Sequence, residues 1–269
     1  MHRIGLPSED RSIFDTRSLD EIYAEIREVY LSTGLPWVIG YSGGKDSTAT
    51  VQLVWYALSS LQREQLRFPV YIIASDTLVE TPVISDHLNA TLQQMNEVAR
   101  EQSLPFEAHK VTPQITDTFW VNLIGRGYPA PNQRFRWCTE RMKIQPANRF
   151  ILDRAAEYGE VVMVLGGRKS ESARRAQVMP AKHGKITGSK LGRHHILSRA
   201  YVYTPIADFT TDDVWTFLLQ VPSAWGGSNR DLAAMYQSAN SGECPLVVDD
   251  TTPSCGNSRF GCLTCTVVT

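Results

Sequence analysis

Apolar residues recur along this chain with two different spacings, and each spacing predicts a different kind of element. Short, continuous apolar runs occur at 36–39, 69–75 and 161–165. Runs of this kind are typical of strands buried on both faces of a sheet. Two further strands are predicted at 106–111 and 201–206. Helical spacing before the first strand predicts an amphipathic helix, with apolar positions Leu19, Ile22, Tyr23, Ile26, Val29 and Tyr30.

Segments with helical periodicity separate the predicted strands. They cover 49–61, 84–99 and 139–158, whereas the Pro-, Gly- and Asn-rich passage 122–133 is predicted to be a loop. Strands that alternate with helices of this length predict an α/β fold, in which a parallel, twisted sheet is flanked by helices. Ligands of such sheets bind beyond the carboxyl ends of the strands.

Three polar loops follow the predicted strands, after Tyr41, Ser75 and Leu165, and we expect them to converge on one site. The first loop has the sequence SGGKDS, residues 42–47. Its two glycines carry no Cβ, so the backbone can turn tightly and bring N–H groups to a ligand oxygen. The following helix N-terminus, the charge of Lys45 and the two serine hydroxyls all favour an anion. A polyphosphate is the expected ligand.

The spacing of this loop differs from the Walker pattern and from the Gly-x-Gly-x-x-Gly dinucleotide turn. It resembles the PP-loop of the ATP pyrophosphatase superfamily, whose members bind ATP, cut the bond between its α and β phosphates and transfer AMP to an acceptor. The resemblance implies an adenine nucleotide alpha-hydrolase-like fold with ATP and Mg²⁺ as ligands, and catalytic roles for Lys45 and Asp46. Asp46 would either order the loop or help to hold Mg²⁺. A glycine turn that merely precedes a helix is the structural alternative. The ATP-binding residues implied for this loop are Tyr41, Ser42, Gly43, Gly44, Lys45, Asp46 and Ser47.

The second loop offers Asp76 and Thr77 as candidates for nucleotide binding. A carboxylate at this position can accept hydrogen bonds from a ribose or adenine group, as in related nucleotide-binding α/β folds. Either residue could instead cap the helix that follows.

The third loop has the sequence GGRKSESARR, residues 166–175. It resembles the GxRxxESxxR signature of the sulfonucleotide-reductase branch of the PP-loop superfamily. Arginine side chains can neutralise a leaving pyrophosphate through planar, bidentate contacts, and we expect Arg168 and Arg174 to do so in catalysis. The nucleotide-binding residues expected here are Gly166, Gly167, Arg168 and Arg175.

The composition is that of an ordinary soluble globular protein, with 42% apolar and 20% charged residues in a chain of 269. Residues 1–20 lack the apolar core of a signal peptide, and no apolar run approaches membrane-spanning length. We therefore expect a cytoplasmic protein without membrane association. The net charge is −1, but nine Lys or Arg accompany a single acid, Glu171, between 168 and 199. This excess of positive charge fits a polyanion contact, with a solvated basic loop as the alternative.

Five cysteines without a secretion signal favour metal binding over a disulfide framework. Cys262 and Cys265 form a CxxC pair, and Cys138 with Cys255 would complete a set of four ligands. Zinc and a [4Fe–4S] cluster have nearly the same ligand demands, so the spacing alone does not separate them.

Five long and unusual sequence segments resemble a particular family within the PP-loop superfamily. They are RWCTERMKIQPANRF, GGRKSESARRAQVM, YTPIADFTTDDVW, WGGSNRDL and GECPLVVDDTTPSCGNSRFGCLTCTVV. Together they resemble the DndC/SspD family of DNA phosphorothioation proteins, in particular its shorter SspD-type members. The resemblance implies an ATP pyrophosphatase that adenylates a DNA backbone phosphate, so that sulfur can replace one of its oxygens. It also implies DNA, a cysteine desulfurase and other proteins of the phosphorothioation system as partners.

The same resemblance implies a [4Fe–4S] cluster on the four cysteines named above. Cys244 would then replace Cys255 as a ligand or carry a persulfide. We expect a PP-loop α/β domain at 1–220 and a Cys-rich iron–sulfur segment at 221–269, completed by Cys138. Three other functions stay open: a phosphoadenylyl-sulfate reductase-like sulfonucleotide reductase, a PP-loop tRNA thiolase, and a non-catalytic scaffold that docks other modification proteins.

Overall fold

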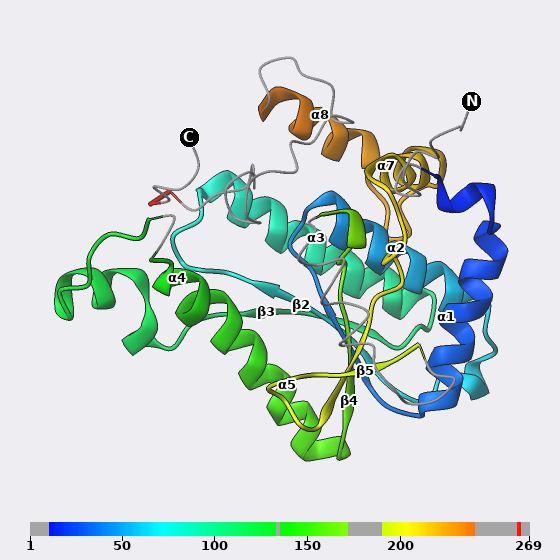
Figure 1. The fold of residues 1–269 in the computed structure, drawn as a ribbon, viewed down its shortest axis with the longest axis horizontal. Helices are drawn as coiled ribbons and strands as arrows, with labels where there is room; N and C mark the ends of the chain where they lie inside the picture. The colour runs from blue at the N-terminus through cyan, green and yellow to red at the C-terminus, as the bar shows by residue number, and fades with distance from the viewer. Residues whose placement is uncertain (1–10, 133–134, 172–189, 240–262, 265–269) are drawn as a thin grey trace, which may run out of the picture.

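The computed structural model describes residues 11–132, 135–171, 190–239 and 263–264. Their centre is a six-stranded sheet with the strand order β3-β2-β1-β4-β6-β5 (Figure 1). Neighbouring strands are parallel except for β5 and β6. The predicted α/β fold with a parallel sheet is therefore confirmed, with one short antiparallel strand added at an edge. The strands are β1 Trp37–Gly40, β2 Val70–Ser75, β3 Phe106–Val111, β4 Val161–Val164, β5 Gly192–Arg193 and β6 Ala200–Tyr203.

Helices and helical turns connect the strands. The α-helices are α1 Leu19–Thr33, α2 Lys45–Ser59, α3 Pro82–Glu101, α4 Trp137–Thr139, α5 Gln145–Tyr158, α7 Thr211–Gln220 and α8 Asn229–Ala239. Two π-helical turns cover Val121–Gly125 and Glu140–Ile144. Short 3-10 turns cover Ile13–Asp15, Arg63–Gln65, Ile115–Asp117 and Lys169–Glu171.

The helix after the first strand begins earlier than the apolar periodicity predicts. α2 starts at Lys45 instead of residue 49, because Gly44 is its extended N-cap residue and the N–H of Thr48 already donates to the Gly44 carbonyl at 2.9 Å. The polar motif is thus itself the first turn of the helix. Part of the predicted loop 122–133 is likewise helical, in the turn Val121–Gly125.

Two α-helices and one strand of the described residues were not predicted from the apolar pattern: α7, α8 and β5. α7 begins with a capping box, in which Thr210 Oγ1 accepts from the Asp213 N–H at 3.1 Å and the Asp213 carboxylate accepts from the Thr210 N–H at 2.8 Å. Aspartate replaces the usual Glu or Gln of this motif, which weakens its sequence signal. β5 has only two residues, too few for any period to show.

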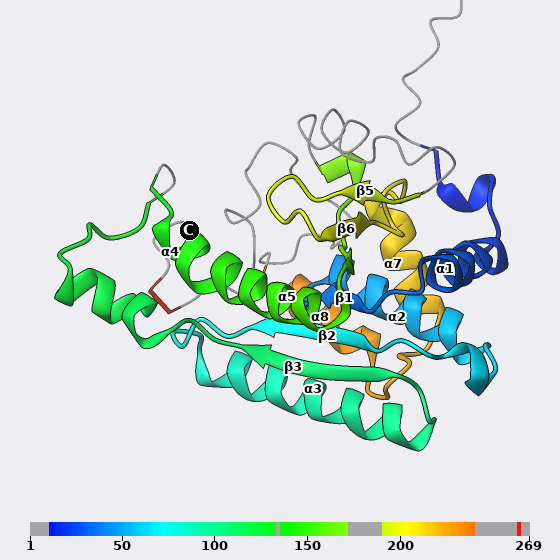
Figure 2. The same cartoon turned by 90° about the horizontal axis from the view of Figure 1, so that it is seen from below.

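Helices cover both faces of the sheet, as Figure 2 shows for α3 below it and α5 above it. Successive residues of a strand point to opposite faces. Trp37 and Ile39 of β1 accordingly belong to one core cluster, together with buried residues of α1, α2, α3, α7 and α8. Val38 belongs to a second cluster, which includes Ile151 and Ala155 of α5. The result is a three-layer α/β/α fold with β1 at its centre.

The segment after residue 220 begins as part of this main fold. Trp225 and Ala233 are buried in the same core cluster as Trp37. The domain division at residue 221 stays a prediction, because most of the Cys-rich segment lies outside the described residues. Within the described part of the chain, no helix combines the length and apolarity needed to cross a bilayer.

Candidate functional site

The SGGKDS loop joins β1 to α2 in the middle of the sheet. Gly43 has a φ of 74°, a left-handed conformation that favours glycine. Two serines hold the loop together: the Ser42 N–H donates to Ser47 Oγ at 3.1 Å, and Ser47 Oγ donates to the Gly44 carbonyl at 3.0 Å. The hydroxyls expected at the ligand therefore also order the loop itself.

Charged side chains at the start of α2 form a buried network. Lys45 Nζ lies 3.0 Å from Asp46 Oδ2, and Arg168 Nε donates to Asp46 Oδ1 at 2.7 Å. Only 7% of Lys45 and 3% of Arg168 is exposed. Two cations thus flank one carboxylate beside the loop. The positive charge that remains favours an anionic ligand.

Arg168 belongs to the third loop and links it to the first loop through its hydrogen bond to Asp46. Besides its bond to Asp46, its Nη1 donates to Ser170 Oγ at 2.9 Å and to Thr211 Oγ1 at 3.0 Å. The first and third loops therefore meet, as the position of both at the carboxyl ends of parallel strands led us to expect. The observed contacts orient the guanidinium towards the protein. A contact between Arg168 and a leaving pyrophosphate stays a prediction.

Gly166 allows the third loop to approach the backbone of α2 closely. A Cβ at this position would lie 2.9 Å from the Asp46 carbonyl oxygen and 3.0 Å from Thr50 Oγ1. Gly167 has more room, because the nearest atom to its Cβ position, Thr204 Cγ2, is 3.8 Å away. Gly166 therefore has a packing role of its own, which the neighbouring Gly167 does not share.

Asp76 and Thr77, which the sequence predicts to bind the nucleotide, make contacts within the protein that hold the second loop in place. Asp76 is 6% exposed and pairs with Lys110 of β3 at 3.1 Å, while Thr77 is fully buried and donates from Oγ1 to Glu80 Oε1 at 2.8 Å. These contacts are internal to the protein. Ser75 and Glu80 line the neighbouring cavity instead. A contact of Asp76 with a ribose or adenine group stays a prediction.

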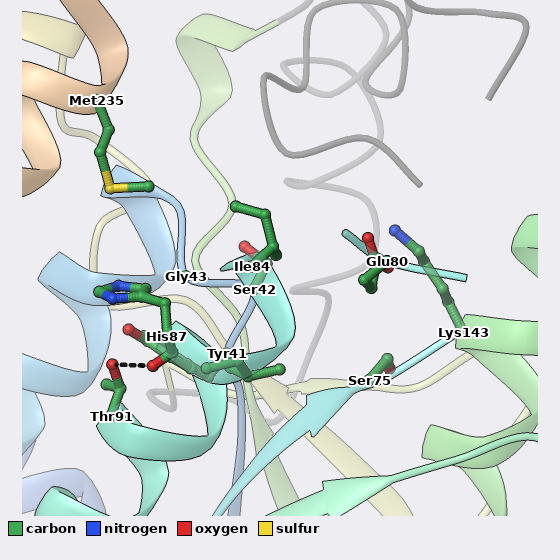
Figure 3. A pocket seen from close by; sticks show the side chains of 11 residues that line it. Tyr41, Ser42, Gly43, Ser75, Glu80, Ile84, His87, Thr91, Lys143 and Met235 are labelled. Atoms are coloured by element: carbon green, nitrogen blue, oxygen red, sulfur yellow. Dashed lines mark hydrogen bonds between the residues drawn. The ribbon is translucent and has the colours of Figure 1, made fainter. Parts of the chain in front are cut away.

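A cavity of about 160 Å³ opens in front of the first loop (Figure 3). It links this loop to the second loop, to α3 and α8, and to the helical turn that follows Cys138. Sequence reasoning missed its two charged side chains, Glu80 and Lys143, although Lys143 lies within the string RWCTERMKIQP. The lining residues are Tyr41, Ser42, Gly43, Ser75, Glu80, Ile84, His87, Leu88, Thr91, Lys143 and Met235.

Tyr41 lines this cavity and has a neutral side chain. Its side chain is 7% exposed, and burial raises the pKa of its phenol to about 12. The hydroxyl therefore keeps its proton at neutral pH. The hydroxyl lies close to the Thr48 side chain and adds no negative charge to the site.

Cys138 is the proposed metal ligand that falls within the described part of the chain. It is half-buried and packs against the apolar cluster that contains Val79, in the loop after β2. The N–H of Leu263, which stands between Cys262 and Cys265, donates to the Val79 carbonyl at 2.8 Å. Figures 1 and 2 both place the short red segment 263–264 beside α4, the helix that carries Cys138. Leu263 thus contacts the same apolar cluster against which Cys138 packs.

The complete ligand set stays a prediction. Cys244, Cys255, Cys262 and Cys265 lie outside the described residues. Among the residues that are described, no three His, Cys, Asp or Glu side chains gather into a metal site.

Four of the five described cations of the basic stretch have an acidic partner. The pairs are Arg168–Asp46, Lys169–Asp208, Lys190–Glu25 at 3.2 Å and Arg193–Glu160 at 4.0 Å. A polyanion contact would therefore depend mainly on the part of the stretch beyond the described residues, which includes Arg174 and Arg175.

Comparison with known proteins assigns this chain to a family. The family model of the phosphoadenosine phosphosulfate reductase domain matches residues 36–223, which include β1, the SGGKDS loop and Arg168. The chain belongs to this family.

Individual relatives are distant. The uncharacterised protein MJ0066 of Methanocaldococcus jannaschii is 26% identical over 195 residues, which are 72% of this chain and 34% of that protein. The chain thus spans about a third of the length of this curated relative. A phosphoadenylyl-sulfate reductase of Candida auris, solved with phosphate, matches with a TM-score of 0.43 and 15% identity over 83% of this chain and 92% of that one. The U34-tRNA thiolase NcsA of Methanococcus maripaludis, solved with its [4Fe–4S] cluster, matches with a TM-score of 0.46 and 12% identity. This match covers 83% of this chain and 73% of that one. Similarities of this size leave the reaction open.

Proposed function

We propose that this chain is an ATP pyrophosphatase that adenylates a phosphate of the DNA backbone and so prepares it for sulfur insertion. The observation that carries the nucleotide part is the turn around Gly43, which leads straight into the first helical turn at Lys45 and faces the cavity. The first N–H groups of a helix have no intrahelical partner and attract anions. A triphosphate chain fits this combination of backbone donors and a buried lysine.

The chemistry needs an activation step, because a phosphodiester oxygen is a very poor leaving group. In the first step, a non-bridging oxygen of the DNA phosphate attacks the α-phosphorus of ATP. A new P–O bond forms, the bond to the β-phosphate breaks, and pyrophosphate leaves. In the second step, sulfur at the sulfide level attacks the DNA phosphorus, and AMP departs with the original oxygen. The products are a phosphorothioate linkage and AMP.

Catalysis of the first step depends on positioning and on charge neutralisation. Lys45 and the loop N–H groups would bind the phosphates, and Lys143 adds a positive charge to the same cavity. Arg174 and Arg175 stay proposed partners of the leaving pyrophosphate.

Asp46 is held between Lys45 and Arg168, so its carboxylate orders the loop. Each Asp46 oxygen already contacts a cation, so a Mg²⁺ ion held by Asp46 would share these oxygens with Lys45 and Arg168, and this role stays a prediction. Mg²⁺ would also bind the phosphate oxygens of ATP, which it prefers together with water.

A [4Fe–4S] cluster would be held by Cys138, Cys255, Cys262 and Cys265, and would supply an iron centre able to bind sulfur. The hydrogen bond between the Leu263 N–H and the Val79 carbonyl supports this ligand set, because Cys138 packs against the same cluster. Val79 immediately precedes Glu80, which lines the cavity. The proposed sulfur chemistry would therefore lie next to the proposed nucleotide. DNA, a cysteine desulfurase and other phosphorothioation proteins are the partners of this proposal.

Pyrophosphate release from ATP by anaerobically purified protein, with and without duplex DNA, tests the proposal. Lys45→Ala should lower the rate by about 100-fold, the effect of removing one preorganised charge-stabilising group. The control is Lys169→Ala, because Lys169 is 41% exposed in its pair with Asp208 and should leave the rate unchanged. Wild-type release from Lys45→Ala would remove the loop from the mechanism. When the wild type is also given a cysteine desulfurase, cysteine and a thiol reductant as the sulfide source, mass spectrometry of nuclease digests of the DNA should show phosphorothioate dinucleotides.

The family match supports a second candidate, a sulfonucleotide reductase. Such an enzyme would release sulfite from an adenylated sulfate in the presence of a thiol reductant and would not consume ATP. Sulfite formation without pyrophosphate release would therefore favour the reductase. Thiolated nucleosides in tRNA, without sulfur in DNA, would favour a tRNA thiolase.

A further inference from the structure

Helix α8 brings a tyrosine to the phosphate-binding loop from 191 residues away in the sequence. The first residue of this helix, Asn229, is 9% exposed and donates from Nδ2 to Gln52 Oε1 at 3.1 Å and to the Leu218 carbonyl at 2.8 Å. These bonds fix the start of α8 against α2 and α7. Further along α8, the ring of Tyr236 packs edge-on against the buried Trp215, with 5.2 Å between ring centres. Tyr236 is therefore presented by a well-anchored part of the fold.

The hydroxyl of Tyr236 lies at the first turn of α2. The N–H of Lys45 donates to Tyr236 Oη at 3.2 Å, and a Cβ on Gly44 would lie 3.1 Å from the same oxygen. Lys45 Nζ is 5.7 Å from the centre of the tyrosine ring. The neighbouring Met235 lines the cavity (Figure 3). Since first-turn N–H groups are the ones that receive a bound anion, the Tyr236 oxygen stands where an oxygen of that anion would bind.

We propose that Tyr236 binds the pyrophosphate end of the nucleotide, an inference that rests on the function proposed above. A phenol both accepts and donates hydrogen bonds. In the structure its oxygen accepts the Lys45 N–H, but a charged phosphate oxygen is a stronger acceptor for that group. When the phosphate enters, the Tyr236 hydroxyl turns from acceptor to donor and donates its hydrogen to the phosphate. Tyr236 lies beyond the range 36–223 that the family model matches.

Calorimetry with inorganic pyrophosphate, ATP and AMP tests this role in the full-length protein. Tyr236→Phe keeps the ring against Trp215 and removes the hydroxyl alone. Losing a hydrogen bond to a charged group should weaken binding of pyrophosphate and ATP about tenfold. AMP lacks the two terminal phosphates, so its affinity should stay at the wild-type value.

Tyr56→Phe is the matched control. Tyr56 also belongs to the α2 region, and its hydroxyl donates to the Pro222 carbonyl at 2.9 Å, between α7 and α8 and not at the loop. This variant should bind all three ligands like the wild type. Tyr236→Phe and Tyr56→Phe should both unfold at the same temperature as the wild type.

Three results would overturn this proposal alone. Equal weakening of AMP and pyrophosphate would give Tyr236 a purely structural role. Unchanged pyrophosphate binding would remove it from the site, and tighter binding would mean that the hydroxyl only obstructs the loop. In each of these cases the wild type still binds ATP, and the proposed function stands. A wild type that binds neither ATP nor pyrophosphate would overturn both.

Discussion

Arg168 and Asp46 stand 122 residues apart in the sequence, yet a 2.7 Å hydrogen bond joins Nε of one to Oδ1 of the other. Arg168 is 3% exposed and the Asp46 side chain 18%, so the bond is largely shielded from bulk water. It ties the loop after β4 to the first turn of α2. Because Asp46 also pairs with Lys45, Arg168 helps to set the position of this lysine at the first turn of α2.

Arg168→Ala should therefore destabilise the protein strongly. Removing Arg168 leaves Asp46 paired with Lys45 alone and deletes the buried hydrogen bonds to Ser170 and Thr211, which typically costs about 1–3 kcal/mol. The matched control is Lys169→Ala, since its ion pair with Asp208 is exposed and should contribute less than about 1 kcal/mol. Urea unfolding measures both. Equal, small losses of unfolding free energy would contradict a structural role for the Arg168–Asp46 bond.

Gly166→Ala should disturb the packing of the third loop on α2. Its Cβ would lie 2.9 Å from the Asp46 carbonyl oxygen, and relief of such an overlap costs about 1–3 kcal/mol. The shift would also move the first turn of α2 and weaken ATP binding. Gly167→Ala meets its nearest neighbour at 3.8 Å and should be tolerated. Thermal unfolding and ATP titration of the two variants compare the positions directly; identical behaviour would exclude the close approach as the reason for glycine.

The sequence predicted the layered α/β fold because its central strands are continuous apolar runs. β1, β2 and β4 are buried on both faces, so they stand out without any knowledge of their neighbours. The start of α2 was misplaced for a physical reason: Lys45 and Asp46 are polar, and apolar periodicity does not register a helical turn made of buried charges. α8 was missed as well, although its buried Ala233 packs in the main core.

The site was predicted less completely than the fold, because its contacts join distant segments. The glycine turn and Lys45 were visible in one short motif. The partner of Asp76 is Lys110 on the next strand, and nothing local in the sequence links the two. Glu80 and Lys143 likewise reach the cavity only through the fold. Motifs show which chemistry is present, whereas the fold decides which groups face the ligand and which face each other.

Asp213 predicts a pH dependence of stability. Burial by itself would raise the pKa of its carboxyl, but hydrogen bonds from Ser12, Thr210 and the N–H of Ile13 outweigh it and hold the pKa below the ordinary 3.8. A carboxyl with a lower pKa in the folded state stabilises the fold above its unfolded pKa, and this stabilisation is lost as the pH falls through the folded value.

Asp213→Asn should therefore cost about 1–2 kcal/mol at pH 7, as for the loss of a helix cap, and progressively less below pH 4. The control is Asp212→Asn, because Asp212 is exposed in the same helical turn and should change stability little at either pH. Urea unfolding across this range is the measurement. A cost that stays constant from pH 7 to pH 3 would rule out the charge as its source.

Cys138→Ser should remove bound iron. If the proposed ligand set is correct, wild-type protein purified without oxygen is brown and carries about four iron atoms per chain, and the variant loses most of them. Cys244→Ser should keep its iron, because Cys255 is the proposed fourth ligand. Iron analysis and visible absorbance measure both variants. Loss of iron from Cys244→Ser alone would transfer the fourth ligand position to Cys244.

The basic stretch should give DNA binding a defined salt dependence. If it neutralises about four phosphates, the logarithm of the duplex affinity should fall with the logarithm of salt concentration with a slope of about −4. Replacing both Arg174 and Arg175 by Gln should make the slope shallower by about 2. Arg193→Gln is the control, since Arg193 already approaches Glu160. A wild-type slope near zero would leave the stretch without a DNA role.

The two margins of the sheet have a consequence for how copies of the protein behave in solution. One margin ends in β5, which offers only the two residues Gly192–Arg193 to a strand from outside. The other is β3, where Glu107 and Lys110 are exposed. Short terminal strands and outward charges both discourage a foreign strand from adding to a sheet. Within the described part of the chain, the sheet is thus poorly suited to recruit neighbours by backbone pairing, which protects concentrated protein from fibrous aggregation.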